Sequence, residues 1–114
     1  MGALKALRLA SDANQKTIDG AVVAGGWVDC RLLAAGVAEV HTVPAGAKFV
    51  LISVTGNVYI TFDTAAAVPA ADVTNGSASI LMVNTLPRIF ELKGAATIGV
   101  IAEAIQSVTF EFFK

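Results

Sequence analysis

The chain has 114 residues, a length that fits one domain, and its formal net charge is −1 at pH 7. Its eight Lys and Arg residues are scattered singly, which argues against direct nucleic-acid binding, because nucleic-acid-binding proteins concentrate positive charge on one surface. Hydrophobic residues make up 55% of the chain, yet charged residues interrupt every long apolar stretch, so no membrane-spanning helix is expected.

The apolar content favours assembly with other chains. A typical soluble domain carries about 25% charged residues, whereas this chain carries 15%. A small domain has a high ratio of surface to volume and cannot bury this much apolar surface by itself. Because large exposed apolar patches usually mark contact sites, we expect an obligate oligomer or a subunit of a larger assembly.

Residues 1–26 are predicted to form an N-terminal arm, which ends in a glycine-rich stretch. Two conformations stay open for the first ten residues: an extended arm, or one or two helical turns that place Leu4 and Leu7 on one side. Lys5 and Arg8 interrupt the apolar residues here, so we expect no signal peptide and a chain made in a cytoplasm.

Residues 27–114 are predicted to form a β domain, in which short runs of β-branched and aromatic residues alternate with turn signals. Gly56 and Asn57 separate two such runs and predict a tight hairpin, and residues 65–79 are predicted to form a long loop. The pattern of roughly seven or eight short antiparallel strands predicts an all-β fold, either a single β-sandwich or a jelly-roll-like barrel. The runs identified as strands are 37–43, 49–55, 58–62, 80–83, 88–92, 97–102 and 108–113.

Catalytic chemistry has little support in the sequence. The single histidine, His41, lies in an alternating strand with no Gly-x-Ser-x-Gly motif beside it, so we expect a partly exposed strand residue and not a catalytic base. One histidine also cannot supply the ligand set of a cupin-type metal site. Asp63, Asp72, Asn75 and Ser77 carry oxygen atoms suited to calcium, but the favoured interpretation is that Asp72 and Asn75 cap turns by bonding to their own backbone. We therefore expect a protein that is not an enzyme and that uses no cofactor or metal.

Four side chains are predicted to make subunit contacts: Leu4, Leu7, Trp27 and Phe113. Trp27 opens the β domain, where packing in the core is the favoured interpretation and an interface anchor is the alternative. Phe113 follows Phe112 in the last strand, and the alternation of a strand places one of the two away from the core. The single cysteine, Cys30, cannot form an intramolecular disulfide and is expected to be a small buried residue.

Several turn-and-strand motifs resemble those of a known group of proteins. They are VPAGAK at 43–48, GNVYITFD at 56–63, AAVPAADVTNGS at 66–77, PRIF at 87–90 and TFEFF at 109–113. In their order and spacing, over residues 37–113, they resemble small structural proteins of tailed bacteriophages, of the capsid decoration or cement type. The resemblance implies no catalytic residues.

From this resemblance we expect a virion protein on the capsid exterior that binds and stabilises the lattice of the major capsid protein. The expected partners are the major capsid protein and further copies of the chain itself, with a homotrimer favoured over a dimer. A neck, tail or fibre-associated component of the virion stays open on the same resemblance. A carbohydrate-binding β-sandwich is the alternative from a different class, motivated by Trp27, Tyr59 and the long loop.

Overall fold

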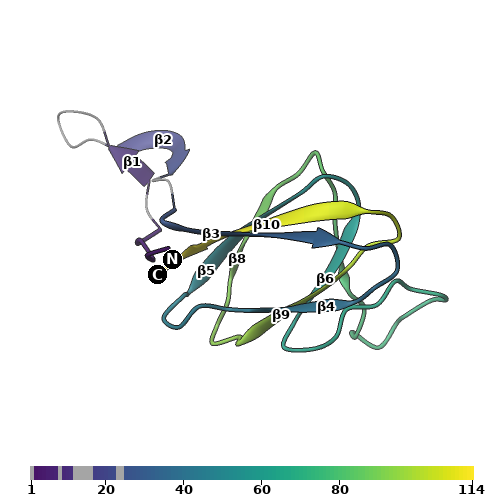
Figure 1. The fold of residues 1–114 in the computed structure, drawn as a ribbon. Helices are drawn as coiled ribbons and strands as arrows, with labels where there is room; N and C mark the ends of the chain where they lie inside the picture. The colour runs from purple at the N-terminus through teal and green to yellow at the C-terminus, as the bar shows by residue number, and fades with distance from the viewer. Residues whose placement is uncertain (1, 8, 12–16, 23–24) are drawn as a thin grey trace.

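The computed structural model describes residues 2–7, 9–11, 17–22 and 25–114, and its regular elements are all β-strands (Figure 1). None of the described residues is helical. The strands are β1 (Leu9–Ser11), β2 (Thr17–Val22), β3 (Trp27–Leu33), β4 (Glu39–Thr42), β5 (Phe49–Val54), β6 (Val58–Phe62), β7 (Ile80–Met82), β8 (Arg88–Glu91), β9 (Thr97–Ile101) and β10 (Gln106–Phe113).

Eight of these strands form two four-stranded antiparallel sheets that face each other. The strand orders are β3-β10-β5-β8 in one sheet and β4-β9-β6-β7 in the other. Along the chain, successive strands pass from one sheet to the other, except between β6 and β7, which are neighbours in the second sheet. Two such interleaved sheets form the jelly-roll arrangement of a β-sandwich. The predicted all-β sandwich of short antiparallel strands is therefore confirmed.

The seven predicted strands correspond to β4–β10, and β6 has the predicted bounds. The tight hairpin predicted at Gly56 and Asn57 is wrong, because β5 and β6 lie in different sheets and residues 55–57 cross between the layers. Glycine and asparagine favour a sharp change of direction, but they do not determine whether the second strand pairs with the first. That choice depends on the neighbours that β5 and β6 find elsewhere in the chain.

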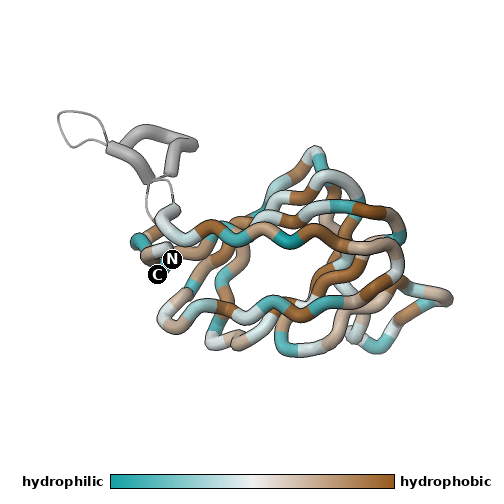
Figure 2. Tube along the Cα trace, viewed as in Figure 1, coloured by the Kyte–Doolittle hydropathy of each residue, from teal (hydrophilic) through white to brown (hydrophobic). Residues whose placement is uncertain are grey.

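The hydrophobic core fills the space between the two sheets. More buried residues alternate with more exposed ones along β3, β4 and β5. Hydropathy alternates along β3 as well (Figure 2), but there the hydrophilic Asp29 and Arg31 are the less exposed residues. Complete burial of a large apolar side chain contributes about 1.5–3 kcal/mol relative to exposure. The largest core side chains are Leu33, Ile52, Ile60, Met82, Ile98, Phe110 and Phe112.

The two ends of the sandwich carry different parts of the chain. Leu33 at the end of β3 pairs with Gln106 at the start of β10, and the end of β5 lies near the start of β8. The loops 34–38, 55–57, 83–87 and 102–105 therefore gather at one end, which we call the distal end. The arrow of β3 points toward this end and away from both termini (Figure 1).

Residues 2–7 run in an extended conformation beside the last residues of β10. Lys5 forms a parallel bridge with Phe113, and its carbonyl accepts a hydrogen bond of 2.9 Å from the Lys114 N–H. The Leu7 N–H donates to the Lys114 carbonyl at 3.2 Å. Of the two conformations that the sequence left open for this segment, the described residues adopt the extended one.

Replacing Leu4 with alanine is expected to lower the free energy of unfolding by about 1–2 kcal/mol, because a half-buried leucine packs against the core. Leu4 contacts the core cluster and lies beside Gly46. Urea unfolding of the two chains measures the difference, and Lys5→Ala, at an exposed neighbour, serves as the matched control. Equal stability of Leu4→Ala and Lys5→Ala would show that residues 2–7 do not pack on the domain in solution.

Candidate functional site

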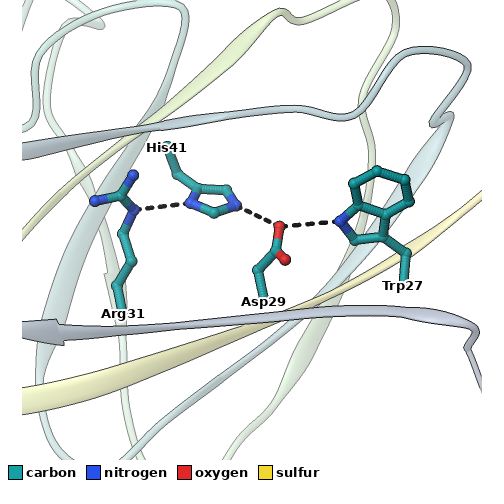
Figure 3. Close-up of polar contacts among 4 residues, drawn as sticks. All are labelled: Trp27, Asp29, Arg31 and His41. Carbon is teal, nitrogen blue, oxygen red and sulfur yellow. Dashed lines mark hydrogen bonds and ion pairs between the residues drawn. The ribbon is translucent and has the colours of Figure 1, made fainter. Parts of the chain in front are cut away.

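A cluster of polar side chains joins the two sheets at the edge where β3 and β4 lie (Figure 3). His41 on β4 bonds two residues of β3: its Nε2 lies 2.8 Å from Asp29 Oδ2, and its Nδ1 lies 2.7 Å from Arg31 Nε. Arg31 also donates from Nη1 to Glu39 Oε1 at 2.9 Å. We call Trp27, Asp29, Arg31, Glu39 and His41 the edge cluster.

The hydrogen bonds of the edge cluster determine the tautomer of His41. A guanidinium Nε–H can only donate, so His41 Nδ1 must accept from Arg31. The proton of the neutral ring therefore lies on Nε2, which donates to Asp29. Asp29 Oδ2 accepts a second bond, of 3.1 Å, from the indole N–H of Trp27.

The ring of His41 packs on aromatic side chains of β10. The imidazole of His41 stacks on Phe110 with ring centroids 4.5 Å apart and an interplanar angle of 13°, and Phe112 lies 5.9 Å away. His41 is only 9% exposed, so the expectation of a partly exposed strand histidine is wrong. The alternation correctly places Glu39 and His41 on one face of β4. That face points inward, where the opposite sheet covers His41.

The arrangement joins the sheets and leaves His41 no nitrogen for a substrate. Both ring nitrogens are bonded within the chain, and no hydroxyl group takes part in the cluster, so the geometry differs from that of a nucleophilic triad. Charged hydrogen bonds of this kind contribute more than neutral ones when their partners are held in place. The edge cluster therefore closes the open side of the sandwich.

The long loop after β6 begins against the outer face of the second sheet. A Cβ atom on Gly99 would meet the Thr64 carbonyl oxygen and would lie 2.9 Å from the Ala66 nitrogen. Asp63, which has a positive φ of 61°, accepts hydrogen bonds at Oδ1 from the backbone N–H groups of Ala96 and Thr97. In the same loop Asn75 Oδ1 accepts from the N–H of Ser77 at 3.1 Å. Asn75 thus bonds to the backbone of its own turn, as expected from the sequence. Asp63 instead bonds to backbone groups at the start of β9.

The distal end exposes large apolar side chains. Ile105 is 80% exposed, Leu86 58% and Val37 51%, each on a different loop of this end. Leu32, near the end of β3, is 79% exposed. An apolar end of this kind, on a domain with few charged residues, is typical of a contact surface.

The four predicted interface residues lie near the termini, away from the distal end. Leu4, Leu7 and Trp27 are half-buried, and Leu4 and Trp27 pack against the core. Phe113 is completely buried: the alternation turns it away from Phe112, and this part of the outer face is covered within the chain. Their contact with a partner stays a prediction.

Cys30 is exposed on the outer face of β3, which corrects the expectation of a buried cysteine. Sequence reasoning did not identify β3 as a strand, and it therefore missed the pairing of Asp29 and Arg31 with His41. The alternation of Trp27, Asp29 and Arg31 with Val28, Cys30 and Leu32 was the available signal. It was concealed because charged residues face inward on this edge strand.

Within residues 2–7, 9–11, 17–22 and 25–114, no three His, Cys, Asp or Glu side chains gather as a metal-binding group. Over the same described residues, no helix has the length and apolar character needed to cross a membrane. Comparison of the chain with family models, curated proteins and solved structures finds no match.

Proposed function

We propose that the chain is a non-enzymatic structural protein of a virion, which binds the exterior of a tailed-phage head and stabilises the lattice of the major capsid protein. The motifs at 43–48, 56–63 and 66–77 motivate the proposal through their resemblance to decoration proteins. A jelly-roll sandwich of two packed sheets also suits a rigid clamp between neighbouring subunits.

The exposed apolar distal end is the observation that carries the proposal. Leu86 and Ile105 lie on separate loops of this end and are 58% and 80% exposed. Burial of apolar area contributes about 25 cal/mol per Å², so even a contact smaller than a standard interface stabilises a lattice when it is repeated many times. In this proposal the distal end contacts the capsid, and the termini with the β1–β2 hairpin lie at the other end of the sandwich.

Cosedimentation with heads of the encoding phage, assembled without the chain, tests this function. Wild-type chain is expected to sediment with the heads and to saturate at a fixed ratio to the major capsid protein. The variants Leu86→Asp and Ile105→Asp place a charge in the contact and are expected to weaken binding at least about tenfold. Val73→Asp, at a 42% exposed residue of the long loop, is the matched control and should bind like the wild type.

Absence of wild-type chain from the head pellet would overturn the proposal. Equal binding by Ile105→Asp and Val73→Asp would overturn the assignment of the distal end as the contact. Circular dichroism of each variant shows whether it is folded, so loss of binding and loss of structure are distinguished.

A carbohydrate-binding module is the second candidate, because a small pocket at the distal end combines an aromatic ring with polar groups. The pocket has a volume of about 270 Å³ and is lined by Asn57, Tyr59, Glu103, Ala104 and Gln106. Ring stacking and amide or carboxylate hydrogen bonds are the interactions that sugars use. A glycan array tests this candidate: binding that Tyr59→Ala abolishes supports it, and an array without signal rejects it.

A further inference from the structure

The outer edge of β3 is open to pairing with another strand. β3 is a terminal strand of its sheet, and in the part of the chain that the structure describes it pairs with β10 alone. Natural edge strands are usually short or protected by Lys, Pro or a bulge, because their unpaired backbone groups bind other strands. β3 spans seven residues, contains no Lys or Pro, and carries exposed Val28 and Leu32 on its outer face.

The sequence of β3 is complementary to itself about Cys30. When a second copy lies antiparallel along this edge with the two-fold axis at Cys30, Val28 faces the partner's Leu32 on the outer side. Asp29 then faces the partner's Arg31 on the inner side, and the relation holds in both directions. Directly opposed residues of an antiparallel pair have Cβ atoms about 4.5–5.5 Å apart, which suits apolar and opposite-charge pairs.

Asp29 and Arg31 keep atoms available for this pairing. Within the chain, Asp29 uses only Oδ2 and Arg31 uses only Nε and Nη1 for hydrogen bonds to described residues. The Asp29 side chain is 33% exposed and the Arg31 side chain 32% exposed. Asp29 Oδ1 and Arg31 Nη2 can therefore bind across the edge while the edge cluster stays intact.

We propose that the chain forms a two-fold dimer in which β3 pairs antiparallel with β3 of a second copy, centred on Cys30. The pairing joins the two β3-β10-β5-β8 sheets into one continuous sheet. Inward charges on an edge strand penalise pairing with an unrelated strand, because they would be left without partners, whereas a second copy supplies the opposite charge at each position. This dimer does not depend on the proposed capsid function. It contains two copies of the chain, whereas the resemblance favours three.

Disulfide cross-linking tests the centre of the pairing. In the proposed dimer the two Cys30 residues are directly opposed, with Cα atoms about 4.5–5.5 Å apart, within the range that a disulfide spans. Because Cys30 is the single cysteine, diamide, which accepts two electrons and two protons from the thiol pair, can link chains only there. We expect rapid and nearly complete dimer formation that 6 M urea prevents.

The register is tested with cysteines at opposed positions in a Cys30→Ser background. An equimolar mixture of Val28→Cys chains and Leu32→Cys chains, one of them carrying a mass tag, is expected to cross-link as the mixed dimer. Like pairs lie four residues apart along the strand, about 13 Å, beyond the reach of a disulfide. Like and mixed dimers in statistical proportion would indicate random collision and would overturn the proposal.

Light scattering on the uncross-linked protein tests the dimer itself. Leu32→Lys leaves the monomer fold unchanged because Leu32 is 79% exposed, and it is expected to raise the dimer dissociation constant at least about tenfold. Ile89→Lys, at a 48% exposed residue of β8 on the opposite edge of the same sheet, is the matched control and should remain dimeric. A wild-type monomer at 100 μM, or a trimer that Leu32→Lys does not disturb, would overturn the proposal.

Discussion

Replacing His41 with alanine is expected to lower the free energy of unfolding by about 2–4 kcal/mol. The change removes the ring that stacks on Phe110 at 4.5 Å, and it leaves Asp29 and Arg31 without the group that joins them. Both losses act on the same contact between the sheets. Urea unfolding followed by tryptophan fluorescence measures the effect, because Trp27 belongs to the edge cluster.

Two further variants separate the contributions of ring stacking and hydrogen bonding to the stability lost in His41→Ala. His41→Phe keeps an aromatic ring over Phe110 and removes both hydrogen bonds, so its destabilisation is expected to fall between those of His41→Ala and the wild type. Thr42→Ala changes the next residue of β4, which is exposed, and is expected to remain within about 0.5 kcal/mol of the wild type. A His41→Ala chain as stable as Thr42→Ala would contradict a role of the edge cluster in joining the sheets.

Replacing Gly99 with alanine is expected to destabilise the fold by about 1–3 kcal/mol and to displace the start of the long loop. The new methyl group would meet the backbone of Thr64 and Ala66, which cannot move aside as the end of a flexible side chain can. Glycine inside a strand often marks such a close approach of backbone. Valine at this position should be worse than alanine, because its side chain is larger.

The measurements for Gly99→Ala are urea unfolding and the rate of thermolysin cleavage within residues 64–79, which should increase. Val40→Ala is the matched control, since Val40 pairs with Gly99, lies on the same outer face and is 52% exposed. It is expected to change stability by about 0.5 kcal/mol at most and to leave the cleavage rate unchanged. Equal behaviour of the two variants would show that the loop does not lie on Gly99 in solution.

Stability and assembly depend on different surfaces of this molecule. Substitutions in the edge cluster or at Gly99 act on contacts within one chain. Substitutions at Leu32, Leu86 and Ile105 act on exposed side chains, so they are expected to change assembly with little effect on folding. The variant sets proposed here therefore distinguish a chain that fails to fold from one that folds and fails to bind.

The sequence alone determined the strands and the fold class. Alternation with a period of two and turn residues such as Pro44 and Gly94 are local signals, and they located seven of the eight sandwich strands. A high apolar content and the absence of a clustered basic region were equally visible in the sequence. Each of these properties depends on neighbouring residues or on composition.

Only the tertiary structure decided which strands pair and what covers each face. Gly56 and Asn57 start a turn, but the partners of β5 and β6 lie far away in the chain, so the turn became a crossing between sheets. His41 became buried because the opposite sheet and the side chains of β3 cover it, whereas Cys30, on the other face of β3, remained exposed. Burial and ion pairing depend on contacts between residues distant in sequence, and local periodicity carries no information about those contacts. For this reason the edge cluster and the self-complementary edge of β3 emerged only from the folded chain.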